Sequence, residues 1–307
     1  MNYVHEKLKS VIYNRLFRDE TLRLGISFGD KPVLKGRSND SEIYYIIRRE
    51  GQGHGFFSNF MHVLMNVAIA DFYGWIPVVD QETRFTLYHT DRSKENNVWY
   101  KYFEGEWSIK SLFETSEKII FSDEKFPFQI YTKFIEETRY LEGLVSKYMR
   151  PRVEFTREAA DFLLSSQVNG AEVIGVHWRG TDMNKVGRQQ ASLSELRFHV
   201  DRALDTGLVK KVFLCADEEK NITDFVNVYG DTVIFTDCYR SSNKSPIHVN
   251  QDTGIRDDHA FLCGKEVLVD ALILSSCKQV VGKNSNVLNS ARILGGIDSD
   301  RVVMLKE

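Results

Sequence analysis

The second half of the chain alternates between short apolar runs and amphipathic segments, and this order constrains the fold more than any other feature. The runs at 172–178, 210–217, 232–237, 278–282 and 301–305 are rich in β-branched residues and predict strands. Helical periodicity marks 192–207, 218–230, 264–277 and 286–295, and Ser192 and Glu195 stand in capping-box spacing. Such alternation predicts a parallel sheet with helices on both faces.

The first half begins with a similar unit. Residues 41–49 (SEIYYIIRR) predict a strand, 56–74 a long buried helix that stops at Gly74, and 75–80 (WIPVVD) a second strand. Between 84 and 155 the chain is rich in aromatic and charged residues, with helical candidates at 109–115 and 131–149. The segment MRPRVEFT (149–156) is the predicted hinge. We expect two α/β domains, residues 1–153 and 154–307, that face a central cleft.

Charge and cysteine usage narrow the classes of partner. The 307 residues include 40 Lys and Arg against 43 Asp and Glu, a net charge of −3, so no positive field draws the chain to nucleic acid or to an anionic membrane. Cys215, Cys238, Cys263 and Cys277 form no CxxC pair, which argues against a zinc site or a dense disulfide framework. With neither a signal-peptide pattern nor an 18-residue apolar run, the sequence predicts a cytoplasmic protein without a membrane anchor.

Polar side chains follow the predicted strands of the second half, where ligands bind to open parallel sheets. The residues at these strand ends are His177, Arg179, Asp182, Asp217, Glu218, Asp237, Asn284, Ser285 and Asn286.

Two of these strand ends suit a phosphate. Residues 282–286 (GKNSN) place small polar groups at the start of a helix, where unpaired backbone N–H groups favour an anion. Arg179 supplies a planar fork of donors that matches two phosphate oxygens. The alternatives are an ordinary N-cap at 284–286 and a solvated surface charge at Arg179.

Asp270 lies in an apolar helix, where a carboxylate is costly to bury unpaired. It either faces solvent or accepts hydrogen bonds from a ligand. The adjacent N1–H and N2–H donors of guanine suit one carboxylate, whereas adenine and uracil do not offer this pair.

The segment GQGHGFFSN (51–59) has glycines at Gly51, Gly53 and Gly55 before a helix, but the dinucleotide-binding GxGxxG pattern is incomplete. The glycines permit a turn or a close backbone approach to a ligand. His54, between two of them, is either a base held toward the cleft or a loop histidine of no consequence. The DSD at 298–300 precedes a terminal strand and is interpreted as a turn, so no metal site is expected.

Three segments together resemble the superfamily of α-1,6-fucosyltransferases and protein O-fucosyltransferases, which includes the bacterial nodulation fucosyltransferase. GHGFFSNFMHVLMNVAIA resembles the first family motif, with Asn59 and His62 in the matching places. GVHWRGTD resembles the second, and KEVLVDALILSSCKQVVGKNSNVLNSARI resembles the third. Residues 84–150 match no family motif.

The resemblance implies a GT-B-like fold of two Rossmann-like domains, with the nucleotide sugar bound in the C-terminal one and no metal or other cofactor required. It implies that His177 and Asp270 contact guanosine, that Arg179 and Ser285 hold the β-phosphate, and that Asp217 lies near the nucleoside. The full predicted donor-binding set is His177, Arg179, Asp217, Asp270, Asn284, Ser285, Asn286, Gly53 and Gly55.

The resemblance is incomplete at the catalytic centre. The α-1,6 members have a second arginine where this chain has Gly180, and a glutamate where KVGRQQ (185–190) contains no carboxylate. The linkage formed is therefore left open. His54 takes the place of a catalytic glutamate in one protein O-fucosyltransferase branch, so the candidate base is His54 first and Asp182 second.

The sequence thus predicts an inverting glycosyltransferase that moves a sugar, L-fucose from GDP-fucose, to a hydroxyl of a glycan acceptor. One alternative is a transferase of the same fold for another nucleotide sugar, a UDP- or GDP-linked pentose or hexose. The other is a nucleotide-binding scaffold without catalysis. The aromatic residues Trp99, Tyr100, Tyr102 and Trp107 either face a sugar or form an aromatic core.

Overall fold

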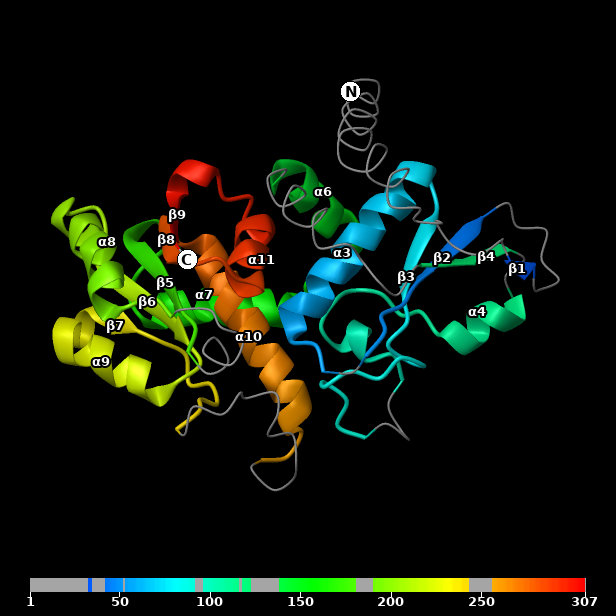
Figure 1. The fold of residues 1–307 in the computed structure, drawn as a ribbon, viewed down its shortest axis with the longest axis horizontal. Helices are drawn as coiled ribbons and strands as arrows, with labels where there is room; N and C mark the ends of the chain where they lie inside the picture. Colours follow the sequence, from blue (N-terminus) through cyan, green and yellow to red (C-terminus); the bar gives the residue numbers. More distant parts are fainter. Residues whose placement is uncertain are drawn as a thin grey trace. The chain divides into compact units, whose positions relative to one another are not determined.

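The structure is a computed structural model. It describes residues 33–34, 42–51, 53–91, 96–115, 118–122, 138–180, 190–242 and 256–306. The chain divides into two compact units (Figure 1). The first comprises Met1–His54 and Ser58–Arg150, and the second comprises Gly55–Phe57 and Pro151–Glu307.

A four-stranded sheet organises the first unit, in the order β1 (Val33–Leu34), β4 (Lys118–Phe121), β2 (Ile43–Ile47) and β3 (Ile76–Val79). β2 pairs in parallel with β3 and with β4, whereas β1 is antiparallel to β4. Helix α3 (Phe56–Tyr73) connects β2 to β3. The predicted strand–helix–strand unit is therefore confirmed.

Helix α3 is buried along nearly its whole length, as its apolar composition requires. Other elements of the unit are a 3₁₀ turn (Val98–Lys101) and helices α4 (Ile109–Thr115) and α6 (Thr138–Tyr148). Trp99 stacks on Phe103 with ring centroids 4.2 Å apart, and Trp99 and Tyr102 are buried. For these two residues the aromatic-core interpretation is confirmed.

Five parallel strands form the sheet of the second unit, in the order β7 (Val233–Ile234), β6 (Lys211–Ala216), β5 (Val173–Trp178), β8 (Gln279–Lys283) and β9 (Val302–Leu305). The predicted parallel sheet is confirmed. β7 is shorter than the predicted strand at 232–237, because only Val233 and Ile234 pair with β6.

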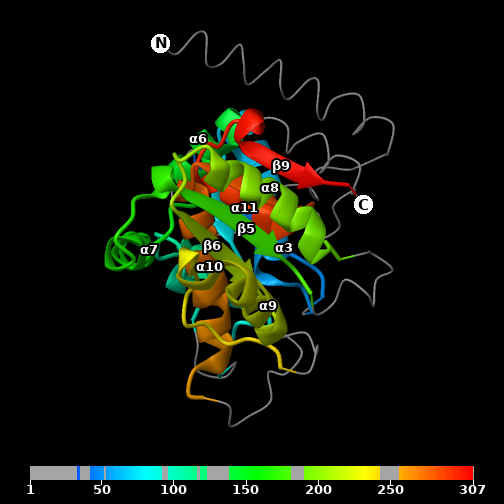
Figure 2. The same cartoon turned by 90° about the vertical axis from the view of Figure 1, so that its left-hand side faces the viewer.

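Helices cover both faces of this sheet (Figure 2). Helices α8 (Leu193–Asp205) and α9 (Glu219–Tyr229) pack on one face, where Trp178 of β5 meets Phe225 at 5.6 Å between ring centroids. Helices α7 (Val153–Ser165) and α10 (His259–Ser276) pack on the other, where Phe213 of β6 meets Phe162 at 5.7 Å. Helix α11 (Asn286–Leu294) packs against α10.

The two faces of β5 are filled differently. Ile174, Val176 and Trp178 join the core under α8 and α9, so the alternate residues Gly175 and His177 face α10. A Cβ at Gly175 would lie 2.7 Å from Leu274 Cδ2 and 3.1 Å from Cys277 Sγ, so a larger residue would require these packed side chains to shift. This alternation places His177 on the α10 face of the sheet.

Local signals in the sequence appear as expected. The Ser192 hydroxyl oxygen accepts the backbone N–H of Glu195 at 3.2 Å, and the Glu195 carboxylate accepts the N–H of Ser192 at 2.7 Å, so the capping box at the start of α8 is confirmed. The DSD segment forms a 3₁₀ turn at Ser299–Arg301. All four cysteines are free thiols. Of the helices in the described ranges, none has both the length and the apolar character needed to cross a membrane.

Candidate functional site

A small hollow lies at the carboxyl ends of β5 and β8, the adjacent central strands of the second unit. Its volume is about 10 Å³, room for about one water-sized group. The six residues that line it are His177, Arg179, Ala191, Lys283, Asn284 and Ser285. Four predicted donor-binding residues, from segments more than 100 positions apart, therefore come together at the sheet edge where ligands bind in such folds.

His177 is buried in this hollow and is uncharged at neutral pH. Burial, followed by the nearby charge of Arg179, lowers the pKa of His177 from 6.5 to about 3. Its Nδ1 atom lies 3.2 Å from Ser285 Oγ, and this hydrogen bond fixes the orientation of the ring. The site thus holds a neutral imidazole beside a cation.

Ser285 has a second function as the N-cap of α11. Its hydroxyl oxygen accepts the backbone N–H of Leu288 at 3.1 Å, so the N-cap interpretation is confirmed. Asn284 Oδ1 accepts from the side chain of Asn289 at 2.9 Å, and Asn286 is the first residue of α11. The positive end of the helix dipole is therefore directed at the hollow.

Lys283 belongs to this site but was not among the predicted donor-binding residues. It is the last residue of β8, it is only 7% exposed, and it lines the hollow together with Arg179. A lysine at a strand end resembles an ordinary surface charge. The available signal was the continuous burial expected of a central parallel strand. Of the six described residues that line the hollow, two are cationic and none is acidic, which favours an anion.

The loop that follows Arg179 is held by the next strand. The Gly180 N–H donates to Asp217 Oδ1 at 2.7 Å, and the Gly180 carbonyl accepts from the Gln190 side chain. A Cβ at position 180 would lie 2.2 Å from Glu218 Oε1. The place of the second family arginine is therefore closed by Glu218, and Asp217, predicted to lie near the nucleoside, anchors this loop.

Asp270 does not line the hollow. It is 4% exposed on α10, so the solvent-facing interpretation is wrong. Its Oδ1 accepts the hydroxyl of Thr236 at 2.6 Å, and Cys215 of β6 is a further hydrogen-bond partner. Burial raises the pKa of Asp270 from 3.8 to about 6, against the stabilising effect of Thr236. The carboxylate lies one strand away from His177, since Cys215 is paired with His177 across β5 and β6.

In the first unit, the glycine-rich loop follows β2 and is held by α3. The Arg49 guanidinium donates to Ser58 Oγ and to Asn59 Oδ1, each at 3.0 Å. Asn59 in turn donates to the carbonyl of His54 at 3.3 Å, and His62 Nε2 donates to the carbonyl of Arg48 at 2.6 Å. The amide and the histidine of the first motif thus support the loop.

His54 folds back over its own loop. Its Nε2 atom lies 3.0 Å from the Glu50 carbonyl, which can only accept, so Nε2 carries the ring proton and Nδ1 is the basic nitrogen. Burial, and then the charge of Arg49, lowers the pKa of His54 below 6.5, so the ring is neutral at pH 7. The left-handed turn of the loop is at Gly51 (φ 85°), while Gly53 and Gly55 have ordinary φ values and open space around them.

The other candidate base, Asp182, lies outside the described residues. Within the described ranges, no group of three or more His, Cys, Asp or Glu side chains is placed to hold a metal ion.

No protein-family model matches the sequence, and no curated protein matches it. Solved structures do match. The fucosyltransferase NodZ from Bradyrhizobium has a TM-score of 0.52 and 17% identity, over 83% of this chain and 94% of that chain. NodZ alpha-1,6-fucosyltransferase structures co-crystallised with GDP and soaked with GDP-fucose each have a TM-score of 0.51 and 18% identity, over 83% and 93%. The resemblance inferred from the motifs is thus confirmed at the level of the fold: the chain has the α/β, GT-B-like fold of the NodZ fucosyltransferase structures.

Proposed function

We propose that this protein is a fucosyltransferase-like glycosyltransferase that transfers L-fucose from GDP-fucose to a hydroxyl of a glycan acceptor, with inversion at the anomeric carbon. The observation that carries the proposal is the basic hollow at the ends of β5 and β8, where Arg179 and Lys283 lie beside the N-terminus of α11. Its support is the fold, which is shared with a NodZ structure soaked with GDP-fucose.

The donor half of the reaction needs stabilisation of a departing diphosphate. As the bond between the anomeric carbon and the β-phosphate oxygen breaks, negative charge accumulates on GDP. Fixed cations and helix-end dipoles stabilise such charge without reorganising. Arg179 provides two parallel donors, Lys283 a point charge and Ser285 a polar contact at the helix end. These cations provide charge compensation, and we infer that activity persists in the presence of a chelator.

The acceptor half needs a base. The acceptor oxygen attacks the anomeric carbon on the face opposite the diphosphate, forms the new glycosidic bond and releases its proton. We propose that Nδ1 of His54 takes this proton, because the ring is neutral at pH 7 and its other nitrogen is committed to Glu50.

We propose that His177 and Asp270 recognise the guanosine of the donor. The neutral His177 ring contacts the nucleoside, and the Asp270 carboxylate accepts the paired N–H donors of guanine. The Asp270 carboxylate accepts from the Thr236 hydroxyl and from Cys215, and it retains further lone pairs for a ligand.

The proposal is tested by thermal shift with GDP, UDP and ADP, because a ligand that binds only the folded state raises the melting temperature. GDP alone is expected to produce a shift. Lys283→Met and Arg179→Ala are expected to remove it, and Arg179→Ala to lower turnover of GDP-fucose by about 10²-fold. The matched control is Lys210→Met, which removes the same charge from a side chain 62% exposed before the start of β6.

Each alternative outcome contradicts a specific part of the proposal. A shift with UDP alone would mean that the donor is a different nucleotide sugar. If the Lys283 and Lys210 variants respond to GDP equally, the hollow is not the diphosphate site. GDP binding without any sugar transfer would indicate a nucleotide-binding scaffold.

A further inference from the structure

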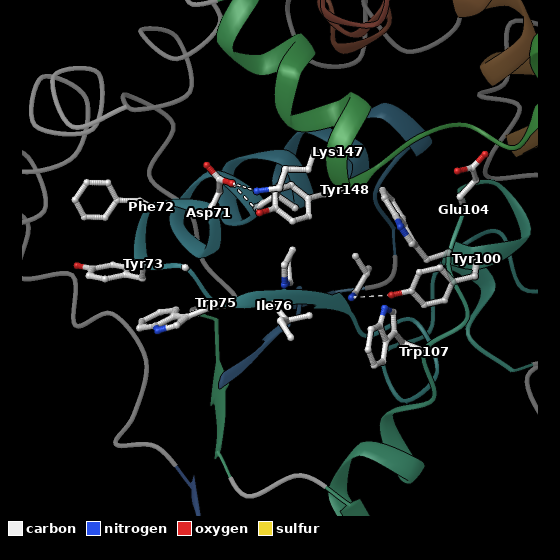
Figure 3. Close-up of a pocket in the computed structure, with 15 residues that line it drawn as sticks. Asp71, Phe72, Tyr73, Trp75, Ile76, Tyr100, Glu104, Trp107, Lys147 and Tyr148 are labelled. Atoms are coloured by element: carbon white, nitrogen blue, oxygen red, sulfur yellow. Dashed lines mark hydrogen bonds and ion pairs between the residues drawn. The ribbon is translucent and has the colours of Figure 1, made fainter. Parts of the chain in front are cut away.

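A pocket of about 730 Å³ opens along β3 in the first unit (Figure 3). This volume is within the range of small-molecule binding sites. Its walls include the last turn of α3, β3, and side chains from the segments that follow. The side chains relevant to binding are Asp71, Tyr73, Trp75, Trp107, Lys147 and Tyr148.

The pocket is distant from the glycine-rich loop. Helix α3 has 18 residues and is therefore about 27 Å long. It begins two residues after His54 and ends at Tyr73, which lines the pocket. The pocket and the proposed base thus lie at opposite ends of one helix, so the pocket is a separate site.

The lining includes seven aromatic side chains, and two of them are more than a third exposed. Tyr73 stacks on Trp75 with ring centroids 4.5 Å apart and an interplanar angle of 17°, and Figure 3 shows this pair at one end of β3. Tyr73 is 45% exposed and Trp107, toward the other end of the strand, is 37% exposed. The faces of such rings are electron-rich and attract the weakly positive C–H bonds on the flat side of a pyranose.

Hydrogen-bonding groups lie beside these rings. Asp71 Oδ1 accepts from Lys147 Nζ at 2.9 Å and from the Tyr148 hydroxyl at 2.7 Å (Figure 3). Glu104, at the rim, pairs with Arg150 at 3.4 Å. Both carboxylates of the lining are paired with a cation, Lys147 in the lining and Arg150 outside it, so neither an anion nor a cation has a clear advantage. A neutral ligand rich in hydroxyl groups suits both the rings and the polar rim.

The edge of β3 argues against a peptide strand as the occupant. Alternate residues of β3 direct their backbone groups away from β2. On this outer side the Trp75 N–H already donates to the Ala70 carbonyl at 2.8 Å, Pro77 has no N–H, and the Val79 N–H donates to the Tyr100 hydroxyl at 3.4 Å. Residues 75–79, all of them described, thus have no backbone donor left for an added strand.

We infer that this pocket is a second carbohydrate site, which binds a short segment of a neutral oligosaccharide by stacking on Tyr73, Trp75 and Trp107. This inference goes beyond the proposed transfer reaction, because neither GDP binding nor His54 contributes to oligosaccharide binding in the pocket.

Intrinsic tryptophan fluorescence provides a direct assay. Three of the four tryptophans of the chain, Trp75, Trp99 and Trp107, line the pocket. The probes are tetrasaccharides of glucose, mannose, galactose and N-acetylglucosamine, in both α and β linkages, with a heparin tetrasaccharide as the charged comparison. At least one neutral probe is expected to change the emission saturably, and the heparin probe is not.

Two variants locate the effect. Tyr73→Ala and Trp107→Ala remove rings that are more than a third exposed, and each is expected to weaken the binding of that neutral probe by about 2- to 10-fold. Phe198→Ala, which removes a ring 57% exposed on α8, is the matched control and should bind normally. Circular dichroism verifies that all three variants are folded.

The inference is overturned if no neutral tetrasaccharide binds saturably, if only heparin binds, or if both pocket variants bind like the Phe198 control. The GDP thermal shift should be the same in all three variants and in the unmodified protein. Failure of this inference therefore leaves the GDP result intact, and failure of the proposed function leaves the saccharide result intact.

Discussion

Replacing Asp270 by asparagine is expected to stabilise the folded protein and to weaken GDP binding. The side chain is buried on α10, and burial raises its pKa from 3.8 to about 6. Between these two values the folded state binds the proton more tightly than the unfolded state, so the stability of the natural protein falls as pH rises through this window. Above pH 6 the whole cost of the buried charge is present.

The size of the effect follows from the shift. A difference of about two pKa units corresponds to about 3 kcal/mol of unfolding free energy. Asn at position 270 keeps one oxygen for the Thr236 hydroxyl, which donates to Oδ1 at 2.6 Å, and it carries no charge. We therefore expect Asp270→Asn to be more stable by up to about 3 kcal/mol at pH 7.5, with the gain disappearing below pH 3.8.

Urea denaturation followed by circular dichroism measures this at pH 7.5, 5 and 3.5, because the midpoint and slope give the unfolding free energy. All other titrating groups are common to both proteins and cancel in the difference. The second measurement is the GDP thermal shift, which should shrink if the carboxylate receives the guanine N–H pair. The reasoning is refuted if the variant is no more stable at pH 7.5, or if its gain does not decrease on acidification.

Three further substitutions examine the loops and the helix end. Gly180→Ala should lower the unfolding free energy by about 1–3 kcal/mol, because the added Cβ would lie 2.2 Å from Glu218 Oε1. Urea denaturation measures this loss. In the double variant with Glu218→Ala, the loss should be smaller than the sum of the two single losses. Ser285→Ala should cost about 1 kcal/mol of stability through the lost N-cap and should also weaken GDP binding in thermal shift, since the His177 ring loses its hydrogen bond. His54→Gln should reduce turnover of GDP-fucose and leave the GDP thermal shift unchanged, and a normal turnover would exclude His54 as the base.

Much of the second unit was predictable because each of its elements carries its own signal. β-branched runs and capping residues predict strands and helices locally, and parallel connection then places all strand ends at one edge. The convergence of His177, Arg179 and Ser285 follows from this topology alone, although Ser285 is 108 positions from His177. The length of β7 was not predictable in this way, because the number of residues that pair with β6 depends on the path of the chain after β7.

Side-chain partners were less predictable, because they depend on ångström-scale geometry between distant segments. Asp217 accepts the backbone N–H of Gly180, and Asp270 accepts the hydroxyl of Thr236, which follows β7. Neither partner has a sequence pattern. The pocket along β3 is formed by separate segments whose aromatic residues resemble ordinary core residues in the sequence. The sequence therefore does not distinguish Trp107, which is exposed in the structure, from Trp99, which is buried.

Gly175 has a consequence for how β5 can assemble at all. Shifting a strand by one residue exchanges its two faces, and the position beside Leu274 and Cys277 would then receive Ile174 or Val176. A branched side chain at this place would have to displace Leu274, because even a Cβ would lie 2.7 Å from its Cδ2 atom. Glycine at position 175 therefore favours the native register, because either one-residue shift would place a branched side chain at this crowded position. The same register places Arg179 directly beyond the carboxyl end of β5.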